Sequence, residues 1–232
     1  VINTGAAPVF IDCDPMTRCV SEPALDAALF WAKLQDKLPK AVIVDDAFGS
    51  VADYDKLLPL CKAHDVPLIE LACDAYGGEY NGVKCGALGD YGIISLCKRV
   101  GGGGAALMLD GDERDRALMF SRMRYSDDEN HDYKMHNVIA ALDCAMLTAA
   151  KKISARAKTN LDILSRSDAI APPVTGDAAS FALCKAAKYF NTLRSEGFNT
   201  KLPPPVHTMP KFTTRPFLEH ECAFGVSKSL AG

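Results

Sequence analysis

The amino-acid sequence predicts an α/β fold in which helices flank a mostly parallel sheet. Two short runs of β-branched and aliphatic residues, 41–45 and 67–71, are separated by residues 53–64, which carry apolar side chains at helical spacing. A strand, a helix and a second strand in this order favour parallel pairing with a right-handed crossover. The chain has 232 residues, of which 48% are hydrophobic, so it can bury a substantial core between such layers.

Further elements are predicted on both sides of this unit. Residues 24–34 are expected to form a helix, with Ser21 placed to cap its start and Pro23 suited to its first turn. Residues 80–83, with the sequence YNGV, are typical of a hairpin turn. The chain should therefore place a helix before the first strand and a hairpin after the second.

Two later strands and two later helices complete the pattern. Residues 92–96 and 105–109 flank four consecutive glycines and are expected to be neighbours in the sheet. Residues 112–124 and 135–164 have helical periodicity. The second of these helices is long enough to connect the sheet to another unit.

The composition limits the classes of partner. The formal net charge is -3 and 24% of the residues are charged, so no basic field is available to attract nucleic acid or an anionic membrane surface. The longest apolar runs are too short to span a bilayer. Nine cysteines, an odd number, show no zinc-ligand spacing, which favours reduced core thiols. We therefore expect a cytoplasmic protein whose partners are small molecules or another protein, with no nucleic acid, membrane or metal involved.

Several residues are open to two interpretations from local pattern alone. The four glycines at 101–104 could wrap a phosphate, but a strand rather than a helix follows them, which favours a tight turn. Lys98, just before them, could act in covalent catalysis or be a solvated surface lysine. Glu70 and Asp74 follow a predicted central strand, where they could bind a cofactor or cap a turn. Asp45 and Asp46 end another such strand, and the loop beside them at residues 48–49 could line a pocket or simply close the chain.

A set of short motifs occurs in one order along the chain. They are residues 5–12 (GAAPVFID), 48–55 (FGSVADYD), 67–70 (PLIE), 75–82 (AYGGEYNG), 86–90 (GALGD), 103–105 (GGA) and 133–135 (YKM). In these motifs and their spacing the chain resembles the DegT/StrS family of pyridoxal-phosphate-dependent sugar aminotransferases, which belongs to the aspartate aminotransferase superfamily. The resemblance covers roughly residues 2–164 and, more weakly, residues 203–231.

The resemblance implies both a fold and an activity. The fold would be a fold-type I pyridoxal-phosphate transferase, with a mixed, mostly parallel sheet flanked by helices and a partial small α+β domain at the C-terminus. Family members transfer an amino group, usually from glutamate, to a keto-sugar attached to a nucleotide, and they generally work as homodimers. By position, Lys98 matches the catalytic lysine that holds pyridoxal 5'-phosphate covalently. Ser95 matches a serine close to the cofactor, and Asp74 matches a position beside the cofactor's phenolic oxygen.

The sequence also departs from the family pattern. The acidic position that pairs with the pyridine nitrogen holds Leu71, and a leucine cannot keep that nitrogen protonated. The segment from Ser95 to the double glycine is about four residues shorter than in the family. Asp132 and Lys134 stand where the family has an asparagine and an arginine. The alternative to an enzyme is therefore a catalytically inactive relative that acts as a binding or dimerisation partner.

The expected domain division follows from the same resemblance. Residues 1–150 are predicted to form the large cofactor-binding domain without its N-terminal part, because the family's phosphate-binding segment would lie upstream of residue 1. Residues 151–232 are predicted to form a linker helix and a partial small domain. Within the latter, the prolines at 172–173 mark a boundary, and a strand at 180–185 and a helix at 188–196 follow. The chain is therefore expected to be incomplete at both ends.

Overall fold

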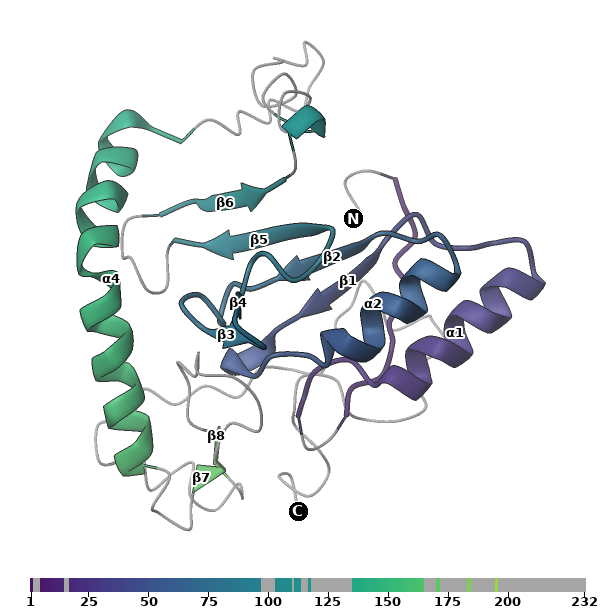
Figure 1. Ribbon diagram of the computed structural model, residues 1–232, viewed down its shortest axis with the longest axis horizontal. Coiled ribbons are helices and arrows are strands. Elements are labelled where there is room, and N and C mark those ends of the chain that lie inside the picture. Colours follow the sequence, from purple (N-terminus) through teal and green to yellow (C-terminus); the bar gives the residue numbers. More distant parts are fainter. Residues whose placement is uncertain are drawn as a thin grey trace.

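A four-stranded mixed sheet forms the centre of the structure (Figure 1). The computed structural model describes residues 1, 5–14, 17–96, 103–109, 111–113, 117, 135–164, 170–171, 183–184 and 195. The strands lie in the order β1 (Val42–Asp45), β2 (Leu68–Leu71), β5 (Tyr91–Ser95) and β6 (Ala105–Met108). The first three pair in parallel, and β6 is antiparallel to β5. The predicted α/β class, with a mixed, mostly parallel sheet, is confirmed.

Strand β2 lies between β1 and β5 and sets the two faces of the sheet. Glu70 in β2 pairs with Val44 on one side and with Gly92 on the other. Because successive side chains alternate along a strand, Leu68 and Glu70 point to one face and Leu71 points to the other. Leu68 and Glu70 are fully buried, whereas Leu71 is half-buried.

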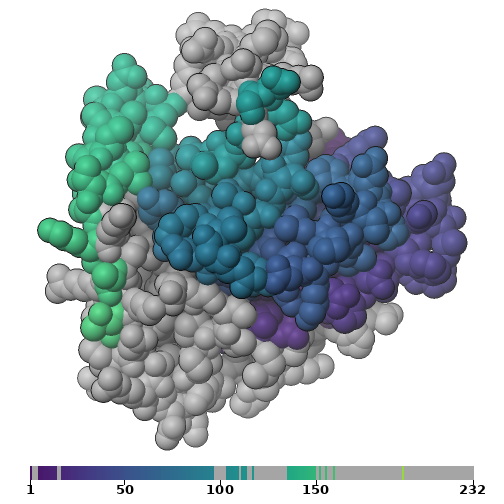
Figure 2. Space-filling model, in the orientation of Figure 1, coloured from purple at the N-terminus to yellow at the C-terminus, as the bar shows by residue number. Residues whose placement is uncertain are grey.

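Two helices cover the buried face of the sheet. They are α1 (Glu22–Leu34) and α2 (Tyr54–Ala63), which lie side by side in Figure 1. Strands buried in a parallel sheet need such a cover, because their side chains are apolar on both faces. In Figure 2 these helices and the strands beside them form one continuous surface. The core between helices and sheet includes Leu25, Leu29, Val44, Leu57, Cys61 and Leu68.

The start of α1 differs in detail from the prediction. Ser21 occupies the cap position and Pro23 the first turn, as expected, and the helix begins two residues earlier than predicted. The Ser21 side chain, however, makes no capping hydrogen bond, so the predicted side-chain cap is wrong. The carbonyl oxygen of Ser21 accepts the N–H of Leu25 at 3.0 Å, which starts the helix through the backbone alone.

The predicted hairpin is present and is tied to α2. Its strands are β3 (Glu79–Tyr80) and β4 (Val83–Lys84), which pair antiparallel. Asn81 and Gly82 between them have φ values of 49° and 81°, the left-handed conformation that a two-residue hairpin turn requires. The Asn81 side-chain amide also donates to Asp55 in α2 at 2.8 Å.

A long helix, α4 (Asn137–Leu164), runs along the edge where β5 passes into β6 (Figure 1). It begins two residues later than predicted and continues through residue 150, so the division into domains 1–150 and 151–232 would fall inside one helix and stays a prediction. Two short strands, β7 (Ile170–Ala171) and β8 (Leu183–Cys184), pair antiparallel beyond it. The expected helices at 112–124 and 188–196 lie mostly outside the described residues. Among the residues that the structure describes, no helix is long and apolar enough to cross a bilayer.

Candidate functional site

The carboxyl ends of the three parallel strands meet at one edge of the sheet, and the candidate site lies there. Backbone hydrogen bonds hold the segments that leave these strands together. The N–H of Asp46, just after β1, donates to the carbonyl oxygen of Leu71 at 3.1 Å, and the N–H of Ala72 donates to that of Ile93 at 2.9 Å. Ligands of open α/β sheets usually bind outside such an edge, as the sequence analysis assumed.

Two of the three predicted site residues are placed at this edge. Ser95 is the last residue of β5, is half-buried and pairs with Ala105 of β6. Asp74 lies in the turn that follows β2 and is also half-buried. The structure therefore brings Asp74 and Ser95 to neighbouring strand ends. Lys98 lies outside the described part of the chain, so its position relative to these two residues stays a prediction.

Leu71 occupies the end of β2, at the position where the family carries an acid. Its side chain points to the face opposite α1 and α2, because Glu70, one residue earlier, points toward those helices. The Glu70 carboxylate therefore lies on the opposite face of the sheet and cannot take the place of an acid at position 71. Asp74 differs from Glu70 in that it lies beyond the end of β2, in the turn at this edge of the sheet.

Glu70 holds the loop between β4 and β5, which decides one of the open interpretations. Its Oε1 accepts the N–H of Gly86, and its Oε2 accepts the N–H groups of Leu88 at 2.7 Å and Gly89 at 3.4 Å. The loop packs directly on β5, since a Cβ atom at Gly92 would lie 1.8 Å from the Gly86 carbonyl oxygen. Glu70 thus holds a loop in the core, which favours the capping interpretation.

Asp46 is a second fully buried acid, at the start of the short 3-10 helix η2 (Ala47–Gly49). Its Oδ1 accepts the N–H of Ala52 at 3.0 Å and the hydroxyl of Tyr54 at 3.2 Å. Burial raises the pKa of Asp46 to about 8, and the neighbouring Glu70 carboxylate adds to this shift, although the bonds from Ala52 and Tyr54 oppose it. No local pattern in the sequence indicates this environment, because Glu70 belongs to another strand, 24 residues further along the chain.

The three buried groups Asp46, Glu70 and Cys85 place their possible ligand atoms within 4.8 Å of one another. In the described ranges this is the one group of side chains with metal-ligand proximity. We assign no ion to it, because three N–H donors already use the Glu70 carboxylate.

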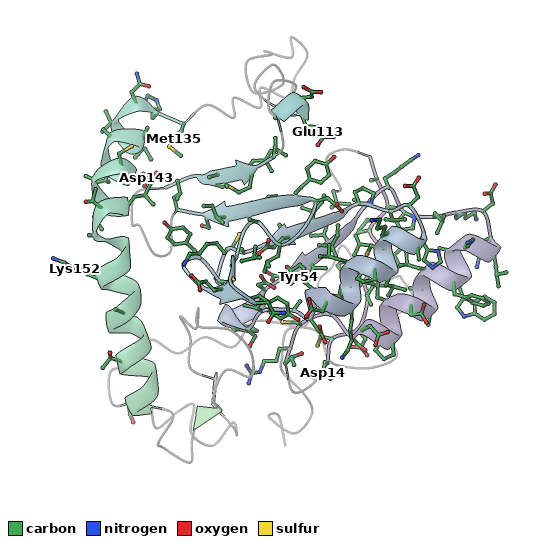
Figure 3. The ribbon with its side chains drawn as sticks, viewed as in Figure 1. Asp14, Tyr54, Glu113, Met135, Asp143 and Lys152 are labelled. Carbon is green, nitrogen blue, oxygen red and sulfur yellow. The ribbon has the colours of Figure 1, made fainter. Side chains whose placement is uncertain are left out.

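Helix α4 contributes a residue that the sequence analysis missed. Asp143 is buried, and its Oδ1 accepts the N–H of Gly103 at 3.3 Å. Figure 3 shows Asp143 and Met135 on the side of α4 that faces the ends of β5 and β6. The N–H of Leu96 also donates to the Gly104 carbonyl oxygen at 3.1 Å, which extends the pairing of β5 and β6 by one residue on each strand. Nothing in the periodicity of α4 marks Asp143, since a helical acid is usually solvated.

Solved structures with the same arrangement of strands and helices are fold-type I aminotransferases. DesI, solved in the presence of its TDP-sugar product, has a TM-score of 0.78 at 20% identity, over 96% of this chain and 62% of that chain. A DegT DnrJ EryC1 StrS aminotransferase from Brucella abortus has a TM-score of 0.74 at 22% identity, over 92% of this chain and 63% of that chain. At such low identity these similarities define the fold, which is that of the fold-type I aminotransferases.

The family follows from the sequence match. Residues 1–179 match the DegT/DnrJ/EryC1/StrS aminotransferase family, and the chain belongs to that family. The resemblance inferred from the motifs is therefore confirmed.

The chain aligns with curated relatives over only part of their length. EpsN of Bacillus subtilis (strain 168), provisionally named a pyridoxal phosphate-dependent aminotransferase, is 34% identical over 158 residues, which are 63% of this chain and 41% of EpsN. The L-glutamine:2-deoxy-scyllo-inosose aminotransferase of Streptomyces lividus is 38% identical over 116 residues, 48% of this chain and 26% of that protein. The GDP-perosamine synthase of Escherichia coli O157:H7 is 28% identical over 174 residues, 70% of this chain and 46% of that protein. The chain spans less than half the length of these relatives.

Proposed function

We propose that this chain is part of an enzyme that transfers an amino group to a keto-sugar attached to a nucleotide, with pyridoxal 5'-phosphate as cofactor. The observation that carries the proposal is the family match over residues 1–179, joined to the placement of Asp74 and Ser95 at one strand edge. The names of the relatives support a sugar-like substrate, and the name GDP-perosamine synthase favours a nucleotide-linked one.

The amino donor needs its own test. The family resemblance favours glutamate, whereas the name of the relative from Streptomyces lividus specifies L-glutamine. Both donors carry the same α-amino group, so a site that binds one through its α-carboxylate accepts the other unless the side-chain pocket discriminates. We propose glutamate as the first donor to assay and L-glutamine as the second.

The residues at the strand edge fit the cofactor in position, with one substitution. When bound, pyridoxal phosphate supplies an electron sink for the transfer of the amino group. Ser95 can donate a hydrogen bond from its hydroxyl to the cofactor. Asp74 is proposed as the acid at the ring, because Leu71 cannot form a charged pair with the pyridine nitrogen. Lys98 is proposed to bind the cofactor covalently through Nζ and to move a proton at the substrate carbon that carries the nitrogen.

Assembly and location are proposed on the same basis. We propose that the enzyme is a homodimer and that it works in the cytoplasm, as the family resemblance implies. The alternative, a catalytically inactive partner protein, is motivated by Leu71, by the short segment after Ser95 and by Asp132 and Lys134. The relatives named above are described as enzymes and give that alternative no support.

Covalent labelling tests the proposal directly. The protein is mixed with pyridoxal phosphate, reduced with borohydride, digested and mapped by mass spectrometry. We expect one adduct per chain on Lys98, its loss in Lys98→Arg, and its retention in the matched control Lys62→Arg on the exposed side of α2. Absence of an adduct, or adducts spread evenly over surface lysines, would contradict the proposed role of Lys98. A positive result leads to assays of keto-sugar nucleotides with glutamate and L-glutamine.

A further inference from the structure

Two carboxyl groups lie together in the core beneath the candidate site. Asp46 follows β1 and Glu70 belongs to β2, and the side chains of both are 0% exposed. Their carboxyl oxygens lie within 4.8 Å of each other and of the Cys85 sulfur. Two ionised carboxylates at this distance in a low-dielectric core repel each other strongly, so the pair requires either a proton or a cation.

The hydrogen bonds around the pair leave one place for a proton. Glu70 Oε2 accepts two N–H groups, and Oε1 accepts one, so Oε1 keeps a lone pair. Asp46 Oδ1 accepts two donors, from Ala52 and Tyr54. Asp46 Oδ2 is buried and receives no hydrogen bond from any group that the structure describes. A proton on Oδ2 would turn this unsatisfied acceptor into a donor, and Glu70 is the acceptor with spare capacity beside it.

The other groups that face the pair add negative or neutral character. The Tyr54 hydroxyl comes from α2, the Cys19 thiol from the segment before α1, and the Cys85 thiol from the loop after β4. Arg18 and Lys84 are the cations that act on these thiols. Lys84 is exposed, and neither cation forms an ion pair with Asp46 or Glu70 in the described part of the structure. No described cation thus neutralises the pair at contact.

We propose that Asp46 and Glu70 share one proton, and that this protonated pair holds the Glu70 carboxylate in the position from which it clamps residues 86–89. The shared proton belongs to Asp46 Oδ2 and is donated to Glu70. Glu70 then keeps its hydrogen bonds from the N–H groups of Gly86, Leu88 and Gly89. Loss of the proton places a second negative charge against Glu70 and weakens the clamp.

The clamp positions the strand that carries the candidate site. Residues 86–89 lead into β5, whose backbone packs against Gly86 and whose last residue is Ser95. Asp46 and Glu70 are therefore positioning residues for the end of β5. This last step rests on the proposed function, whereas the shared proton and the clamp do not require that the protein bind any cofactor.

Equilibrium unfolding against pH tests the shared proton. An acid whose pKa is raised in the folded state binds a proton there that the unfolded chain has released, so stability is highest at low pH and falls as pH rises to the folded pKa. For Asp46 this window runs from about 4 to about 8. The folding equilibrium constant of the wild-type protein should therefore fall, relative to Asp46→Asn, by up to about tenfold per pH unit within the window and level off above it.

The variants separate the pair from general acid effects. The amide introduced by Asp46→Asn can donate permanently to Glu70, so its stability should not share this fall. Asp26→Asn, an exposed acid on α1, should follow the wild-type curve. Amide exchange of Gly86, Leu88 and Gly89 should lose protection above about pH 8 in the wild-type protein and keep it in Asp46→Asn. These readouts need no cofactor, so their failure is distinct from failure at Lys98.

Two results would overturn the proposal. One is a wild-type stability curve parallel to that of Asp46→Asn, and the other is a stoichiometric metal ion in the purified protein, which would neutralise the pair without a proton. If Asp46→Asn does not fold, carbon-13 NMR of the aspartate carboxyl groups in the wild-type protein decides the matter. We expect one aspartate to titrate near pH 8, and the absence of any aspartate titrating above about pH 6 would refute the shared proton.

Discussion

The hydroxyl of Tyr54 donates to Oδ1 of Asp46 at 3.2 Å and joins the first turn of α2 to the segment that leaves β1. Both residues are almost completely buried. Asp46 also lies against Glu70, which holds the loop before β5. This one contact therefore connects the helical layer, the first strand and the loop that leads to the candidate site.

Removal of that hydroxyl should destabilise the fold. Tyr54→Phe keeps the aromatic ring, which packs edge-on against the ring of Tyr80 with 6.1 Å between the ring centroids. The change leaves Asp46 with one hydrogen-bond donor, the N–H of Ala52. We expect a loss of about 1–3 kcal/mol in the free energy of unfolding, measured with urea. Tyr80→Phe is the matched control, since its hydroxyl bonds to Asp53 at an exposed site. It should cost less than about 0.5 kcal/mol, and equal losses in both variants would contradict a special role for Tyr54.

Neutralising Glu70 should release the loop before β5. Glu70→Gln keeps the shape of the side chain but replaces one acceptor oxygen by an amide that cannot accept the N–H groups of the loop. We expect a loss of about 2–3 kcal/mol in the free energy of unfolding. Glu79→Gln, at the exposed hairpin, should stay within about 0.5 kcal/mol of the wild type. A Glu70→Gln protein as stable as wild type would show that other groups hold this loop.

A side chain at Gly92 should not be tolerated. The Cβ atom of Gly92→Ala would overlap the carbonyl oxygen of Gly86, which belongs to backbone and cannot move aside as a flexible side chain could. We expect more than about 4 kcal/mol of destabilisation, seen as insoluble or unfolded protein. Gly111→Ala is the control, because its Cβ would have no neighbour within 4 Å. Soluble, cooperatively unfolding Gly92→Ala would mean that the loop is displaced without cost.

An acid at position 71 should strengthen the proposed chemistry. Leu71 is half-buried at the end of β2, so Leu71→Asp can be accommodated at modest cost in stability. If the enzyme binds pyridoxal phosphate, the new carboxylate should raise the rate of amino transfer by about 10- to 100-fold. Leu71→Asn introduces a side chain of the same shape as aspartate but without its charge, so it should not raise the rate. Rates unchanged by Leu71→Asp would contradict a position of the cofactor ring beside residue 71.

The buried thiols should resist alkylation in the native protein. Burial, followed by the charge of Asp46, raises the pKa of Cys19 to about 12, and burial raises that of Cys85 to about 12 with Asp46 and Glu70 adding to it. Both thiols therefore stay protonated and unreactive at mildly alkaline pH. Cys144 on α4 is exposed. Mass spectrometry after iodoacetamide treatment should show Cys144 labelled on the order of 100-fold faster than Cys19 or Cys85. Similar rates for Cys85 and Cys144 would imply that the loop between β4 and β5 is open.

Local pattern was sufficient to predict most of the described elements. The strands at 42–45 and 68–71, the helix between them and the turn at 81–82 follow from periodicity and from residues that favour left-handed backbone. The motif order was sufficient to predict the family. These features depend on residues close together in sequence or on motifs shared with relatives, so the sequence alone is sufficient to predict them.

The roles of Glu70, Asp46 and Asp143 were decided only by the tertiary structure. Glu70 and Asp143 receive hydrogen-bond donors from segments 16 to 40 residues away. Asp46 receives its donors from Ala52 and Tyr54, six and eight residues further along the chain, and is buried against Glu70 of the neighbouring strand. Sequence periodicity gives the face on which a side chain lies, but not the partner brought to that face by a loop. The sequence by itself determined the sheet, its helices and the family, whereas tertiary packing decided which acids lie at the strand ends and which are held in the core.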